Sequence, residues 1–215
     1  MPLNTLAYPY EEAAGRRKLI DAALKLGAEK RGIVSLGLRE VAREAGLNPN
    51  TFYRHFKDMQ ELALVAIDEM GDELRRTLTD LRSRMREPLE ASRATVDWSF
   101  SFALRHPDAA IAMVSEMNSA SPTVRGHLRA MMQDLSSDIA ANVRRFTGGN
   151  VATTPTDSDM AFQLSRTVTL QLFQESVNYL ENPDQRENIK SWSTTLVNIL
   201  FSGNTPFGKG RSSLA

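Results

Sequence analysis

Cysteine is absent from all 215 residues, so the chain can form neither a disulfide nor a thiolate metal site. That absence fits a reducing compartment. No apolar run approaches the roughly 18–20 residues that a membrane-spanning helix needs. The first residues, MPLNTLAYPYEEAAGRRK, lack the charged-then-apolar order of a secretory signal. We therefore expect a soluble, cytoplasmic protein with no membrane partner.

Signatures of catalysis are also missing. The three histidines, His55, His106 and His127, fall in different expected helices and lack the i, i+4 or carboxylate spacing of a metal site. There is no nucleophile elbow, no glycine-rich phosphate loop and no paired-carboxylate signature. We predict that the protein is not an enzyme and that it has no cofactor and no metal.

Charge is balanced overall but not along the chain. The formal net charge is zero, from 26 basic and 26 acidic residues. Residues 1–58 hold ten Lys/Arg against seven Asp/Glu, whereas residues 59–215 hold 16 against 19. A basic N-terminal part on an acidic body indicates an anionic partner at the N-terminal end, although a solvated surface would look the same.

Helical periodicity dominates the sequence, and no strand alternation is evident. We predict an all-α fold with a three-helix head and a C-terminal bundle of about six helices. The expected domains are a head at 11–58, a bundle at 59–202 and a flexible tail at 203–215. Expected helices cover about 15–31, 38–45, a short segment from 49, 58–86, a segment between Pro88 and Pro107, and then 107–118, 122–146, 158–181 and 184–202.

The stretch GLNPNTFYRHF, residues 46–56, predicts a tight turn between two short helices. Gly46 can adopt the left-handed conformation that ends the preceding helix. Asn48 is a favourable N-cap, and Pro49 suits the first helical position. Two helices joined by so short a glycine turn form a helix-turn-helix.

The second helix of this pair has two chemically different faces. At 100° per residue, Phe52 and Phe56 share one side, which must be buried. The other side carries Asn50, Thr51, Arg54 and His55, flanked by Tyr53. Asn and Arg can read base edges in a major groove, and Thr, Tyr and His can contact methyl groups or phosphate. A helical corner with a solvated face would show the same pattern.

The segments RRKLIDAALKLGAEKRG and LREVAREAGLNPNTFYRHFKDMQEL, within residues 15–62, resemble the DNA-binding domain of the tetracycline-repressor (TetR) family. The resemblance implies a homodimeric repressor that binds a palindromic operator in double-stranded DNA. It implies a ligand-binding bundle that dimerises through its last two helices. It also implies the following DNA-contact residues: Arg16, Arg17, Arg39, Asn48, Asn50, Thr51, Tyr53, Arg54, His55 and Lys57. Met59 and Gln60 stand where many members have lysine, so we expect them to contribute little.

Within that family, SLGLREVAREAG, FYRHFKDMQELAL and DEMGDELR look closest to the fatty-acid-biosynthesis (FabR-like) branch. Glu116, Ser121 and Arg125 fit a run found in acyl-responsive relatives, but Ser115 and Met117 replace its two arginines. An acyl-CoA effector and another hydrophobic effector therefore both stay open. The predicted effector contacts are Trp98, Phe102, Met113, Glu116, Met117, Arg125, Met131 and Phe173, although most could equally be core residues.

The last two expected helices carry more apolar residues than one buried face requires. Phe162, Leu170, Phe173 and Phe201 lie outside the main stripes and suggest a second buried face, as a dimer needs. We predict a ligand-responsive repressor of fatty-acid or lipid metabolism genes. The alternatives are a repressor of an efflux or catabolic gene and, in another class, a helical interaction module that binds no DNA.

Overall fold

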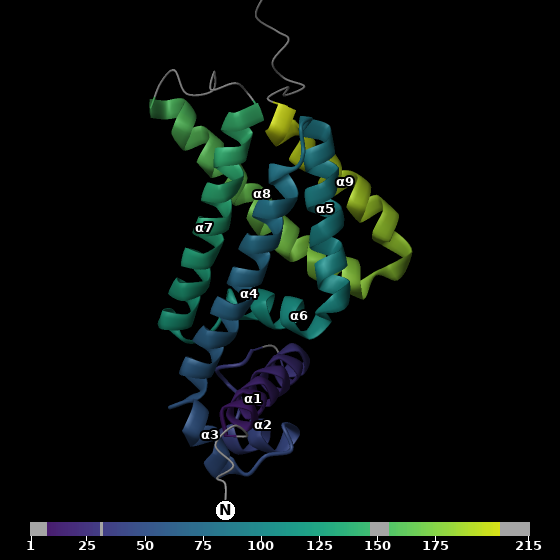
Figure 1. Ribbon diagram of the computed structural model, residues 1–215. Helices are drawn as coiled ribbons and strands as arrows, with labels where there is room; N and C mark the ends of the chain where they lie inside the picture. The colour runs from purple at the N-terminus through teal and green to yellow at the C-terminus, as the bar shows by residue number, and fades with distance from the viewer. Residues whose placement is uncertain (1–7, 31, 147–154, 203–215) are drawn as a thin grey trace, which may run out of the picture. The chain divides into compact units, whose positions relative to one another are not determined.

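The computed structural model describes residues 8–30, 32–146 and 155–202, and the predicted tail at 203–215 lies outside them. Every regular element in these ranges is helical, as the periodicity predicts (Figure 1). The elements are α1 (Tyr8–Lys30), α2 (Leu38–Glu44), α3 (Pro49–His55), α4 (Met59–Ser83), α5 (Pro88–Arg105), α6 (Pro107–Glu116), α7 (Pro122–Phe146), α8 (Pro155–Glu181), the 3₁₀ turn η1 (Pro183–Gln185) and α9 (Arg186–Ser202).

The chain divides into two compact units. The first, here the head unit, contains α1, α2, α3, α4 as far as Gly71, α6, and α7 as far as Met131. The second, here the bundle unit, contains the remainder of α4 and α7 together with α5, α8, η1 and α9. The predicted DNA-binding domain at 11–58 thus falls in the head unit, which also includes α6.

Helix α1 begins at Tyr8, earlier than the predicted start at Gly15. Pro9 is compatible with this start, because the first helical positions donate no intrahelical hydrogen bond. The other end follows the prediction. Gly32 has φ +147°, and its N–H donates to Gly27 O at 2.9 Å. A side chain at residue 32 would be strained in that conformation, so glycine is needed where the chain leaves α1.

The core of the head unit forms where the short helices meet α1. Leu19 and Ala23 of α1, Val41 of α2 and Phe52 of α3 are fully buried. Ion pairs join the exposed edges of α1 and α2: Lys25 contacts Glu44 at 2.5 Å, and Lys30 contacts Glu40. Exposed pairs of this kind contribute little, so apolar burial holds the three helices together.

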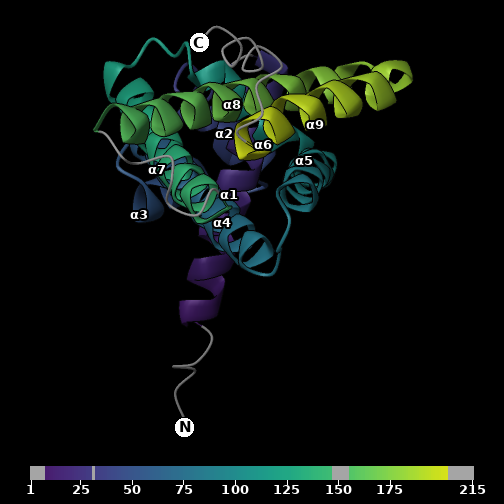
Figure 2. The same ribbon diagram turned by 90° about the horizontal axis from the view of Figure 1, so that it is seen from above.

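The bundle unit has its own core. Val96 and Phe100 of α5 pack with Val168 and Leu172 of α8, and residues of α7 and α9 complete the cluster. The ring of Tyr179 stacks on Phe100 at 4.4 Å between centroids. Helices α8 and α9 lie side by side (Figure 2). Among the helices in the described ranges, none is long and apolar enough to cross a membrane.

Candidate DNA-binding and effector sites

The turn between α2 and α3 has the predicted geometry. Gly46 has φ +67°, and its N–H donates to Arg43 O at 3.0 Å. The N–H of Leu47 donates to Ala42 O at 2.8 Å, which satisfies another carbonyl at the end of α2. Asn48 Oδ1 accepts from the N–H of Asn50 at 2.9 Å and caps α3. These bonds fix α3 relative to α2, as a helix-turn-helix requires.

Helix α3 is anchored by its aromatic face. Phe52 and Phe56 are 0% and 2% exposed, and their ring centroids lie 5.7 Å apart. On the opposite side, the Tyr53 side chain is 66% exposed, and Asn50 and Arg54 are also exposed. Asn48 is exposed as well and serves as the cap, while Thr51 is half-buried. The structure therefore presents an amide, a phenol and a guanidinium together on one outward face.

His55 differs from the other predicted reading residues because it also packs inside the head. It is only partly exposed. A Cβ added at Gly15 of α1 would lie 2.9 Å from His55 Nε2, so the absence of a side chain at Gly15 makes room for the imidazole. His55 thus helps to seat α3 on α1, and its role as a base or phosphate contact stays a prediction.

The predicted phosphate contacts fall into two groups. Arg39, Arg54 and Lys57 are exposed, and their side chains form no hydrogen bond or ion pair with the described residues. Arg16 and Arg17 instead contact the carboxylate of Glu69 on α4, the latter at 3.3 Å, and Arg17 also pairs with Asp21 at 2.5 Å. Glu69 was not singled out from the sequence, because it lies more than 50 residues away from both arginines.

We expect Glu69→Gln to tighten DNA binding if Arg16 and Arg17 contact phosphate. The neutral amide no longer competes for Arg16, whereas Arg17 keeps its pair with Asp21, and an exposed ion pair is worth about 0.2–1 kcal/mol. Affinity should therefore rise by about 1.4- to 5-fold for each half-site, with a steeper dependence on salt. Fluorescence anisotropy at several salt concentrations measures both quantities.

Asp68→Asn is the matched control for this prediction. It removes one negative charge from the same helix, but Asp68 contacts His127 at 2.6 Å rather than the two arginines. Equal tightening by the two variants would mean that net charge alone acts, and would contradict the assignment of Arg16 and Arg17.

Gln60, in the first turn of α4, and Ser121, just before α7, form a hydrogen bond with each other. The hydroxyl of Ser121, the N-cap of α7, donates to Gln60 Oε1 at 2.7 Å. Met59 is buried. Met59 is thus covered and Gln60 is hydrogen-bonded within the protein, and their small contribution to DNA binding stays a prediction.

The eight predicted effector contacts are divided between the units. Met113, Glu116, Met117, Arg125 and Met131 belong to the head unit, and Trp98, Phe102 and Phe173 belong to the bundle unit. Met113 and Phe102 are buried, whereas Phe173 and Trp98 are partly exposed. Arg125 donates to the backbone carbonyl of Ser119. Neither unit contains all eight residues, and their role as effector contacts stays a prediction.

Glu116, the last residue of α6, is fully buried and has a definite partner. Its Oε1 accepts hydrogen bonds from the backbone N–H groups of Ile33, and of Val34 at 3.3 Å. These groups belong to the loop between α1 and α2. The carboxylate therefore links α6 to the loop that precedes the helix-turn-helix, a contact across 83 residues of sequence.

We expect Glu116→Ala to lower the free energy of unfolding by about 1–3 kcal/mol, because two donors of the loop lose their acceptor in a buried place. Glu116→Gln retains an acceptor oxygen and should cost less. Chemical unfolding followed by circular dichroism measures both variants. If Glu116 contacted an effector rather than the loop, Glu116→Gln would weaken effector binding and Glu116→Ala would leave stability unchanged.

Arg82 of α4 is a buried cation in the bundle unit that the sequence did not single out. It is 1% exposed, and its Nε donates to Thr95 Oγ1 at 3.4 Å. Burial lowers the pKa of Arg82 to about 10, with a partial offset from the carboxylate of Asp138. The guanidinium therefore stays charged at neutral pH. The burial of Arg82 depends on tertiary packing around α4, so the sequence alone did not indicate it.

No group of three or more His, Asp or Glu side chains in the described ranges is arranged to hold a metal ion.

Comparisons with known proteins agree with this geometry. Residues 19–66 match the family described as "Bacterial regulatory proteins, tetR family". These residues run from the core of α1 through α2 and α3 into α4. The match thus includes the anchored helix-turn-helix and the exposed face of α3.

Solved structures share the fold over nearly the whole chain. The transcriptional regulator FadR of Bacillus subtilis, in complex with stearoyl-CoA, is 18% identical, with a TM-score of 0.69 and coverage of 88% of this chain and 99% of that one. The fatty acid degradation regulator FadR of Bacillus halodurans has a TM-score of 0.71 at 15% identity, over 88% and 95% of the chains. SmeT in complex with triclosan has a TM-score of 0.68 at 15% identity, over 91% and 93%.

The fold is therefore an all-helical one with a helix-turn-helix near its N-terminal end. Residues 19–66 thus resemble a TetR-type DNA-binding domain, and the chain as a whole shares the fold of these solved regulators.

Proposed function

We propose that the protein is a ligand-responsive transcriptional repressor that binds a palindromic operator as a homodimer. The observation that carries this proposal is the anchored helix α3, with Phe52 and Phe56 inside and Asn50, Tyr53 and Arg54 presented outward. Two such helices related by a two-fold axis would enter major grooves about 34–36 Å apart, or a multiple of that separation.

Apolar side chains on the last two helices support the dimer. Trp192 of α9 is 60% exposed, and Leu164 and Leu170 of α8 are exposed too. Phe173 is only partly covered. Large apolar groups left in water on adjacent helices favour burial against a second copy of the same pair. Phe201, which was also expected on this face, lies among the residues whose side chains are not described.

The effector is proposed to act through the helices that contribute to both units. α4 and α7 each supply residues to the head unit and to the bundle unit. A ligand that prefers one setting of these helices would change operator affinity, and a coupling of about 1–3 kcal/mol corresponds to a change of about 5- to 150-fold. A ligand with equal affinity for both settings would change nothing.

Two classes of effector are each suggested by one solved structure of the same fold. Our first proposal is a long-chain acyl-CoA, with genes of fatty-acid or lipid metabolism as targets, because a relative of the same fold binds stearoyl-CoA. The alternative is another hydrophobic small molecule, with an efflux or catabolic gene as target, because SmeT of the same fold binds triclosan.

An operator complex titrated with effectors separates the two proposals. Fluorescence anisotropy would follow the complex in stearoyl-CoA, in triclosan and in free coenzyme A. A shift in operator affinity with stearoyl-CoA but not with free coenzyme A supports the lipid-sensing repressor. A shift with triclosan alone supports the alternative. No shift with either would overturn both effector assignments and leave DNA binding in place. Repression is tested with a reporter gene placed behind the operator. If its expression does not rise when the protein is removed, repression is contradicted.

A further inference from the structure

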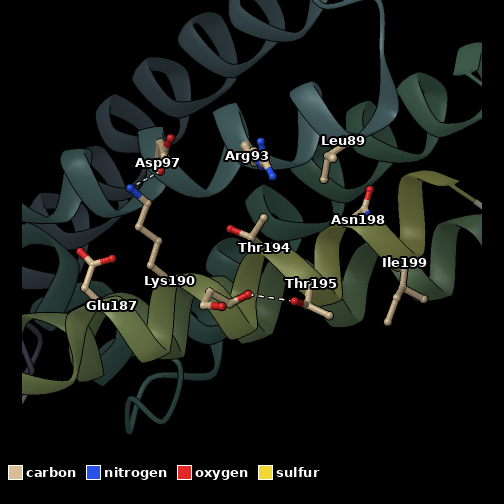
Figure 3. A pocket seen from close by; sticks show the side chains of 10 residues that line it. Leu89, Arg93, Asp97, Glu187, Lys190, Thr194, Thr195, Asn198 and Ile199 are labelled. Carbon is tan, nitrogen blue, oxygen red and sulfur yellow. Dashed lines mark hydrogen bonds and ion pairs between the residues drawn. The ribbon is translucent and has the colours of Figure 1, made fainter. Parts of the chain in front are cut away.

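A groove between α5 and α9 lies wholly within the bundle unit and has a volume of about 480 Å³ (Figure 3). That volume falls within the roughly 300–1,000 Å³ of ordinary small-molecule sites. Leu89, Arg93 and Asp97 line it from α5, at intervals of four residues. The facing side comes from α9 and consists of Glu187, Lys190, Ser191, Thr194, Thr195, Asn198 and Ile199.

An ion pair closes one end of this groove. Lys190 Nζ lies 2.7 Å from Asp97 Oδ1 (Figure 3). The hydrogen bond to Asp97 raises the pKa of Lys190, and the carboxylate of Glu187 nearby acts in the same direction. Lys190 is therefore charged at neutral pH and already engaged. With two carboxylates around one ammonium, this end of the groove disfavours a second anion.

Arg93 is the unengaged cation in the middle of the groove. It is exposed, and its guanidinium forms no hydrogen bond or ion pair with the described residues. Figure 3 shows it on α5 between Asp97 and Leu89, across from Thr194 and Asn198 of α9. The hydroxyl of Thr194 and the amide of Asn198 also donate to no described residue. A guanidinium facing a hydroxyl and an amide suits a carboxylate.

The other end of the groove is apolar. Leu89 is 42% exposed, and it lies one helical turn, about 6 Å, from Arg93 along α5. Ile199 of α9 lines the groove as well. A chain of a few carbon atoms attached to a carboxylate at Arg93 would reach these side chains and cover them from water.

We propose that the α5–α9 groove binds a small organic monoanion, a carboxylate with a short apolar chain, through Arg93, Thr194 and Asn198. The lining carries two cations and two carboxylates, so a single negative charge suits it better than a doubly charged phosphate ester. The site lies wholly within the bundle unit. It does not depend on the effector assigned above or on DNA binding.

Trp192, the exposed tryptophan proposed at the dimer interface, shares part of its side of α9 with this groove. Trp192 is two residues from both Lys190 and Thr194, and two residues are about 200° apart around an α-helix. Lys190 and Thr194 therefore face away from Trp192, whereas Thr195 and Ile199, three and seven residues beyond it, lie on its side of α9.

Isothermal titration calorimetry with hexanoate, and with neutral hexanamide of the same shape, tests the site. We expect hexanoate to bind at least about tenfold more tightly than hexanamide, because only the carboxylate can pair with Arg93. Arg93→Gln should abolish that preference. The matched control, Arg166→Gln, removes an exposed arginine of α8 that does not line the groove and should leave the preference unchanged.

A second variant gives an effect of opposite sign. Asp97→Asn breaks the ion pair and frees Lys190 as a second cation, so hexanoate should bind several-fold more tightly than to the unmodified protein. Circular dichroism verifies that each variant is folded. Equal binding of hexanoate and hexanamide, or a preference that survives in Arg93→Gln, would overturn the proposal. Weaker binding of hexanoate to Asp97→Asn would do so too.

Discussion

Replacing Arg54 by alanine is expected to weaken operator binding by about 5- to 150-fold for each half-site, since a bidentate contact to a base is worth about 1–3 kcal/mol. Arg54 is exposed on α3 and engages no described residue, so it is available to a guanine edge. The loss should be confined to the cognate operator and should be small on unrelated DNA, because a base contact carries sequence information. Competition anisotropy with operator and random duplexes measures both affinities.

Arg129→Ala is the control for this prediction. Arg129 is an exposed arginine of the head unit on α7, away from α3, and it forms no hydrogen bond or ion pair with the described residues. Its removal changes the net charge by the same amount. If both variants lose affinity equally, and equally on random DNA, the contact is electrostatic and Arg54 does not read a base.

Replacing Phe52 by alanine is expected to cost about 3–5 kcal/mol of unfolding free energy. The ring is completely buried and packs on Phe56 and on the edge of Tyr53. Because small domains are stable by only about 5–15 kcal/mol, this loss should release α3 from the head. Operator binding should then fall to the non-specific level. Urea unfolding followed by circular dichroism gives the stability, and anisotropy gives the affinity.

Two neighbouring variants show whether burial is the cause. Phe52→Leu retains most of the apolar volume and should cost far less than Phe52→Ala. Tyr53→Ala removes an equally large but exposed ring, so it should leave stability nearly unchanged while weakening operator binding. A stable Phe52→Ala protein that still binds the operator would contradict the anchoring role assigned to the phenylalanine pair.

Features of the head that depend on neighbouring residues could be predicted from the sequence. Gly46 ends α2 in the left-handed conformation, Asn48 caps α3, and Phe52 and Phe56 are buried, each as expected. These outcomes depend on backbone sterics and on the 3.6-residue period, and both are local. Pro107 and Pro122 likewise mark helix starts correctly.

Features that depend on tertiary contact could not be predicted in this way. The hydrogen bond that the carboxylate of Glu116 accepts from Ile33, 83 residues away, was not predicted, and its role as an effector contact stays a prediction. The engagement of Arg16 by Glu69 and the groove between α5 and α9 also bring together distant parts of the chain. No periodicity within one helix encodes which partner its polar face will meet.

The most direct test of the central claim is a titration of the protein onto DNA from the promoter region of its own gene, followed by fluorescence anisotropy at fixed salt. We predict saturable binding to a palindromic site that resists excess random DNA and weakens steeply as salt increases. Binding that random DNA displaces completely, or the absence of specific binding to any promoter-proximal palindrome, would contradict the assignment of α3 as a recognition helix.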